Sequence, residues 1–150
     1  MNYTQQQALK AELQKPAYTA LATAQEKADA INTNISTTKF KKVEYNDVVA
    51  YLTFREKING ILAAEATNDF AREILFLSTK SKLERFDLNQ PYTATSVNRL
   101  LDGLTAAGLI DSTPVDDKSN ILSLANMTVA EALGLGTVKD YDVTNAEAAN

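Results

Sequence analysis

The sequence predicts a mostly α-helical protein, a compact bundle of about five to seven short helices with one extended segment near residues 33–43. Apolar residues recur at three- and four-residue intervals along much of the chain, which is the period of an amphipathic helix. Hydrophobic residues make up 45% and charged residues 23% of the 150 residues, the balance of a globular chain that can bury a core. No linker rich in glycine, serine or proline divides the chain, so we expect a single domain over 1–150.

The first expected helix covers residues 4–14. Thr4 is a suitable cap, and Leu9 and Leu13 lie one turn apart on the same face. Pro16 disfavours a helical backbone at the residue before it, so the helix should end there.

A second helix is expected over residues 24–32, because Thr23 and Glu26 form a capping box. From 33 to 43 the helical period disappears and β-branched residues replace alanine. This stretch predicts an extended connector, with Phe40 as an anchor onto the core.

The middle of the chain predicts two longer helical stretches. The first runs from about residue 44 to 62, with a break expected near 53–54, and the second runs from 69 to about 79. Both carry an apolar stripe at helical spacing. The polar stretch 78–89 contains Leu83 and predicts one more helical turn.

Asn89-Gln90-Pro91 should interrupt the helical pattern, and Thr93 or Thr95 should then open a further helix that runs through Ala107. Gly108 follows at the position where a left-handed residue commonly ends a helix. The polar loop 111–120 comes next, and the short apolar segment 121–124 is either a strand or a helical turn.

The C-terminal end predicts two short helices, at 128–133 and 140–149, the second capped by Asp140. Gly134 and Gly136 resemble part of a phosphate-binding loop, but the third glycine, the preceding strand and the Lys-Ser/Thr pair are missing. We therefore interpret these glycines as a helix stop.

The composition excludes several classes of chemistry. The chain has no His, no Cys and no Trp, so it lacks the commonest general base, thiolate nucleophiles and the usual ligands of transition metals. A hydroxyl nucleophile needs an activating base, and no spacing of Lys or carboxylates supplies one. The acidic pairs at 116–117 and at 140 and 142 lack the ligand spacing of an EF-hand. We expect no catalytic residue, no metal, no cofactor and no enzymatic activity.

The net charge of −4 argues weakly against binding nucleic acid through its phosphates. Residues 1–91 carry 12 Lys/Arg and 11 Asp/Glu, whereas residues 92–150 carry 3 and 8. The one local cluster of basic residues is the run Lys39, Phe40, Lys41 and Lys42. Three interpretations stay open for it: an edge strand guarded by lysines, a contact strip for an acidic partner, and a single-strand nucleic-acid binder.

Residues 94–124 match the outline of a winged helix, in which a recognition helix ends in Gly-Leu-Ile and a β wing follows. In that interpretation Ser96, Asn98 and Arg99 would meet bases or phosphates. Arg99 is the only cation on this helix and the expected wing is acidic, so counterion release would provide little affinity. A winged-helix DNA-binding regulator is therefore the alternative, not the first hypothesis.

Both ends of the chain resemble small proteins that tailed bacteriophages encode in or beside their virion structural genes. Three stretches carry the resemblance. The first comprises residues 9–13, 16–18 and 28–32, and the second is the Thr/Lys-rich segment 33–43, which leads to 47–49. The third is Ala130-Glu131-Ala132-Leu133-Gly134-Leu135-Gly136-Thr137-Val138, followed by Asp142-Val143. The resemblance implies a virion or virion-assembly protein with no catalytic residues to transfer. The implied partners are other phage virion proteins, in many symmetric copies.

The first hypothesis is thus a structural or assembly protein of a tailed phage that acts through protein–protein contacts. The expected contact regions are residues 4–14, 33–43 and 140–149, because termini and extended segments commonly add to a partner's groove or sheet edge. A scaffold that helps assembly and then leaves the particle is a third option. The polar N-terminus and the lack of an apolar run of about 20 residues predict no membrane partner and synthesis in the cytoplasm. The resemblance implies that this is the cytoplasm of a host cell and that the protein resides in the virion afterwards.

Overall fold

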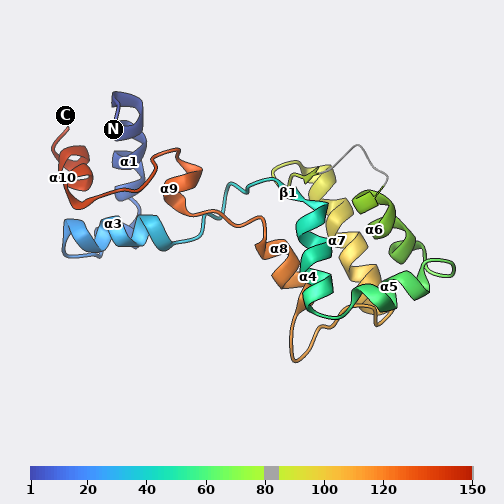
Figure 1. Cartoon of the computed structure of the whole chain (residues 1–150). Coiled ribbons are helices and arrows are strands. Elements are labelled where there is room, and N and C mark those ends of the chain that lie inside the picture. Colours follow the sequence, from blue (N-terminus) through green and yellow to red (C-terminus); the bar gives the residue numbers. More distant parts are fainter. Residues whose placement is uncertain (80–84, 150) are drawn as a thin grey trace. The chain divides into compact units, whose positions relative to one another are not determined.

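A computed structural model describes residues 1–79 and 85–149, and it confirms a mostly α-helical fold (Figure 1). Within that range there are ten helices and two strands of two residues each. In chain order they are α1 (Tyr3–Leu13), α2 (Pro16–Thr19), α3 (Ala24–Thr33), β1 (Val43–Glu44), α4 (Tyr45–Phe54), α5 (Ile58–Ala64), α6 (Asp69–Thr79), β2 (Arg85–Phe86), α7 (Pro91–Ala106), α8 (Asp117–Ser123), α9 (Val129–Ala132) and α10 (Asp140–Ala148). No helix among these residues is long and apolar enough to cross a membrane.

The described residues contain more helices than the five to seven expected, because several are only one or two turns long. The break predicted near 53–54 is present: α4 ends at Phe54, and Glu56 adopts a left-handed backbone with φ 58°. The strand considered for 121–124 is wrong, and the alternative of a helical turn is correct. Most of that segment belongs to α8, because the Asp116 carboxylate accepts the Ser119 N–H at 2.9 Å and caps the helix.

The stretch predicted to form one more turn within 78–89 is only partly described. Leu83 lies outside the described residues. Residues 85–86 form β2, which pairs antiparallel with β1 so that Val43 lies opposite Phe86.

Helix ends follow the local signals at most positions. Gly108 and Gly134 have φ of 69° and 67°, and both follow helices that end as predicted. The N–H of Leu135 reaches back to Ala130 O at 3.0 Å, which is the hydrogen bond expected of a glycine stop. Asp140 is the first residue of α10 and not its cap, since Lys139 occupies the cap position.

The contacts of the chain fall into two compact groups. The terminal unit comprises Met1–Lys39 and Met127–Asn150, and the central unit comprises Phe40–Asn126. The chain therefore leaves the terminal unit once and returns to it once. The single domain expected from the absence of a linker stays a prediction.

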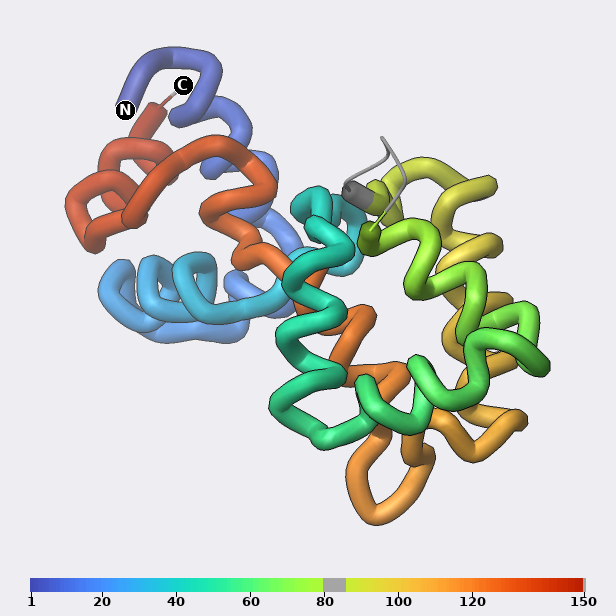
Figure 2. Tube along the Cα trace, turned by 45° about the vertical axis from the view of Figure 1, so that its right-hand side comes forward, coloured from blue at the N-terminus to red at the C-terminus, as the bar shows by residue number. Residues whose placement is uncertain are grey.

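In the terminal unit, α10 lies against α1 and α3, and α9 packs on α3 (Figure 2). Ala28 is fully buried, so its small side chain allows α3 to approach its neighbours closely. Asn32 ties α3 to the segment before α10, because its carboxamide donates to Val138 O and accepts the Val138 N–H. The core residues are Leu9, Leu13, Tyr18, Ala28, Ile31, Ala130, Leu135, Val138, Val143 and Ala146.

In the central unit, α6 packs against α4, α5 and α7, and the two short strands lie beside α4 and α7. The rings of Tyr45 and Phe86 meet at 5.5 Å between centroids and join β2 to the start of α4. The two ends of this unit are tied together, because the Lys41 N–H donates to Ala125 O at 2.9 Å.

Candidate contact site

The acidic residues considered for a cation have structural partners. Asp117 is completely buried, and its carboxylate accepts hydrogen bonds from the Tyr51 hydroxyl at 2.6 Å, Arg55 Nε at 2.8 Å and the Asp111 N–H at 2.8 Å. Burial opposes ionisation of Asp117, but the hydrogen bonds from Arg55 and Tyr51 outweigh it and lower the pKa. In residues 1–79 and 85–149, no group of three or more His, Cys, Asp or Glu could hold a metal ion.

The four residues of the basic run are placed differently from one another. Lys39 belongs to the terminal unit, where its Nζ donates to Ala132 O at 2.8 Å. The other three belong to the central unit, where Lys42 Nζ lies 3.9 Å from Asp87 Oδ2. The run ends directly before β1 and is not itself part of a strand.

Phe40 is partly buried and packs against the core of the central unit. The Asn89 carboxamide accepts the Phe40 N–H at 2.9 Å and donates to the Phe40 carbonyl at 2.7 Å. This side chain therefore occupies the two backbone groups that an extended segment would offer to another chain.

Lys41 and Lys42 share a surface groove of about 750 Å³ with the exposed face of α4. We call it the α4 groove, and its other lining residues are Val43, Glu44, Asp47, Ala50, Tyr51, Phe54 and Leu124. Phe54 is 84% exposed, an unusual state for so large an apolar side chain. The groove thus combines an exposed aromatic ring with charges of both signs.

The exposure of Phe54 follows from its place on α4. The buried residues of this helix are Tyr45, Val48 and Leu52, which lie on one face. Phe54 comes two residues after Leu52, so it points roughly 200° around the helix axis from that face. Phe54 was not among the contacts predicted from the sequence, although an aromatic residue outside the apolar stripe of the helix was a signal for it.

The three candidate DNA contacts on α7 are not assembled into one free polar surface. Arg99 donates to both carboxylate oxygens of Glu73, at 2.8 and 2.9 Å, and lies 5.6 Å from the centroid of the Phe70 ring. The Asn98 carboxamide donates to Ala94 O within the helix, while Ser96 is exposed. The β wing expected after this helix is wrong, because α8 follows the loop.

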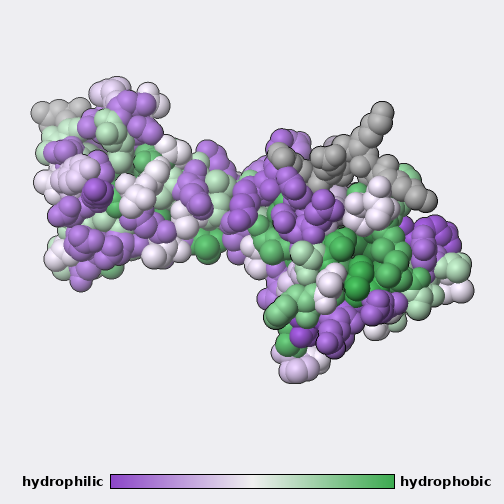
Figure 3. Space-filling model, viewed as in Figure 1, coloured by the Kyte–Doolittle hydropathy of each residue, from purple (hydrophilic) through white to green (hydrophobic). Residues whose placement is uncertain are grey.

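Apolar surface gathers on the central unit over α6 and α7 (Figure 3). Phe70 lies across α7 at Gly103, where a Cβ atom would come within 2.4 Å of the Phe70 ring. Gly103 is therefore required for this close approach, and the Phe70 ring in turn supports Arg99.

The comparisons with known proteins give no relative for this chain. No protein-family model matches it, and neither the curated proteins nor the solved structures contain a significant match.

Proposed function

We propose that this chain is a non-enzymatic structural or assembly protein of a tailed bacteriophage virion and acts through protein–protein contacts. The observation that carries the proposal is the α4 groove, which is lined both by the exposed ring of Phe54 and by Lys41 and Lys42. Aromatic anchors with a polar surround are typical of protein interfaces.

The resemblance at both ends of the chain and in the Thr/Lys-rich segment 33–43 supports the virion assignment. A symmetric particle presents many copies of each partner, so a groove of modest affinity still gives stable attachment when copies bind together. The two lysines favour a partner with acidic residues around an apolar pocket, because opposite charges guide the approach and fix its orientation.

The first experiment asks whether the chain is part of the particle. Virions purified on a density gradient should contain it in fixed stoichiometry when measured by quantitative mass spectrometry. Particles free of the chain would refute a structural role in the mature virion. Its presence in infected cells alone would then support a scaffold that leaves after assembly.

The second experiment tests the α4 groove. The variant Phe54→Ser with Lys41→Glu should lower the amount of chain per virion at least tenfold, because it removes the aromatic anchor and reverses a charge. Tyr92→Ser is the matched control, since Tyr92 is an equally exposed aromatic residue at 91% and lies outside the groove. Equal incorporation of both variants would exclude the groove as the contact.

The winged-helix alternative makes a separate prediction. It requires a DNA mobility shift that weakens steeply with salt and in Arg99→Ala. Because Glu73 already neutralises Arg99, we expect no shift at low salt.

A further inference from the structure

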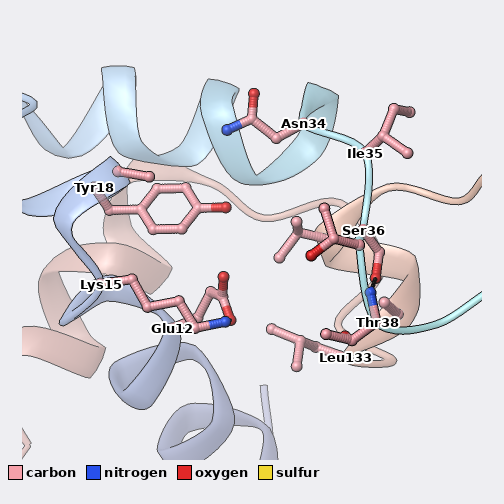
Figure 4. Close-up of a pocket in the computed structure, with 12 residues that line it drawn as sticks. Glu12, Lys15, Tyr18, Asn34, Ile35, Ser36, Thr38 and Leu133 are labelled. Atoms are coloured by element: carbon pink, nitrogen blue, oxygen red, sulfur yellow. Dashed lines mark hydrogen bonds and ion pairs between the residues drawn. The ribbon is translucent and has the colours of Figure 1, made fainter.

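The terminal unit contains a cavity of about 420 Å³ that the proposed function does not use (Figure 4). It lies between the end of α1, the start of α2, the extended segment after α3 and α9. We call it the Glu12 cavity, and the lining residues that matter here are Glu12, Lys15, Tyr18, Asn34, Val129 and Leu133.

The carboxylate of Glu12 is the more buried of the two charged groups that line this cavity. Its side chain is only 10% exposed, although it carries a negative charge. Its ion-pair partner is Lys15, whose Nζ lies 2.5 Å from Glu12 Oε2. The Lys15 side chain is 59% exposed, so it reaches the Glu12 carboxylate from the protein surface. Because Lys15 is exposed, its side chain loses rotational freedom when it pairs with Glu12, and this entropy cost weakens its hold on the carboxylate.

Neutral polar groups surround the carboxylate. Figure 4 shows the Tyr18 hydroxyl and the Glu12 carboxylate pointing into the same space. Burial raises the pKa of Tyr18, and a hydrogen bond from the Asn34 side chain opposes that effect. The hydroxyl is therefore neutral near pH 7 and presents an oxygen lone pair to a cation.

Apolar side chains also line the cavity. Val129 is the first residue of α9, Leu133 directly follows this helix, and Ile35 lies in the segment after α3. A carboxylate and a hydroxyl together with aliphatic side chains in one cavity match a ligand with a charged head and a hydrocarbon stem.

We propose that the Glu12 cavity binds an alkylammonium group, with the ammonium taking the place of Lys15 at Glu12 and the methylene stem lying against Val129 and Leu133. The lysine side chain of a partner protein and a free alkylamine both have this chemistry. An anion does not fit, because the buried Glu12 carboxylate would repel it.

The test is an NMR titration of the ¹⁵N-labelled full chain with Nα-acetyl-lysine methylamide and, separately, with n-butylamine. Saturable shifts are expected at the Asn34 side-chain amide and at the backbone amides of Thr37 and Thr38, which line the cavity. Tighter binding of the lysine derivative identifies a protein side chain as the ligand, and equal binding identifies a free alkylamine. Nα-acetyl-norleucine methylamide has the stem without the charge and should cause no saturable shift.

Three variants make the test specific. Glu12→Gln should weaken binding at least tenfold, because the buried charge partner is removed. Lys15→Met should tighten it about two- to fivefold, because the internal competitor is gone. Glu65→Gln removes an exposed carboxylate of the central unit and should change nothing. If Glu12→Gln fails to fold, Lys15→Met alone decides, and unchanged or weaker binding in that variant overturns the proposal. Absence of saturable shifts in the native chain at millimolar ligand also overturns it.

Discussion

Asp117 should contribute more to the stability of the central unit than any surface ion pair. The perturbation is Asp117→Asn, which keeps the side-chain shape but removes the charge. The native carboxylate accepts from Tyr51, Arg55 and the Asp111 N–H, all within 2.8 Å. In the variant one carboxylate oxygen becomes an NH₂ donor, so at least one of these donors loses its acceptor.

The expected loss follows from the burial of this network. Removing one partner of a buried ion pair destabilises by about 3–5 kcal/mol, and the side chain of Arg55 is 25% exposed, which favours the lower limit. Arg55 also retains Asp111, at 3.3 Å. We therefore expect a loss of about 3 kcal/mol in the free energy of unfolding, measured by urea denaturation at pH 7.

The pH dependence provides a second measurement of the same interaction. The pKa of Asp117 is lower in the folded protein, so the stabilisation is present above its unfolded pKa of about 3.9 and is lost as the pH falls through the folded value. The difference between wild type and Asp117→Asn should therefore shrink below about pH 4.

Asp102→Asn is the matched control for this experiment. Asp102 pairs with Lys118 at 2.6 Å, but its side chain is 63% exposed. Its loss should lower the free energy of unfolding by less than about 1 kcal/mol. If Asp117→Asn were no more destabilising than Asp102→Asn, the argument from burial would be refuted.

Three further predictions concern packing, backbone conformation and domain structure. Gly103→Ala should lower the free energy of unfolding by about 1 kcal/mol, because the cost of overpacking against Phe70 exceeds the gain in helix propensity. In a double-mutant cycle with Phe70→Ala, this loss should disappear because the ring is absent. Glu56→Gly should raise the free energy of unfolding by up to about 1 kcal/mol, because an L-residue is strained at φ 58°; an unchanged urea midpoint would contradict this. A fragment of residues 40–126 should unfold cooperatively by circular dichroism, because it has its own core and tied ends; a non-cooperative transition would show that it needs the terminal unit.

The sequence alone determined the features that depend on a few neighbouring residues. The helical class, the capping box of Thr23 and Glu26, and the stops at Gly108 and Gly134 all follow from hydrogen bonds within one or two turns. The break after Phe54 was also predictable, because the apolar period weakens there. These signals need no knowledge of which helices later pack together.

The tertiary structure decided every feature that joins distant parts of the chain. Arg55 and Asp117 are 62 residues apart, and no local rule pairs them. The same holds for the ion pair between Arg99 and Glu73. It also holds for the cavity that Glu12 lines together with the segment after α3. Ion pairs and cavities depend on which faces meet, and meeting faces are selected by the burial of the whole core. Local sequence therefore sets where helices begin and end, whereas global packing sets which side chains are left available to a partner.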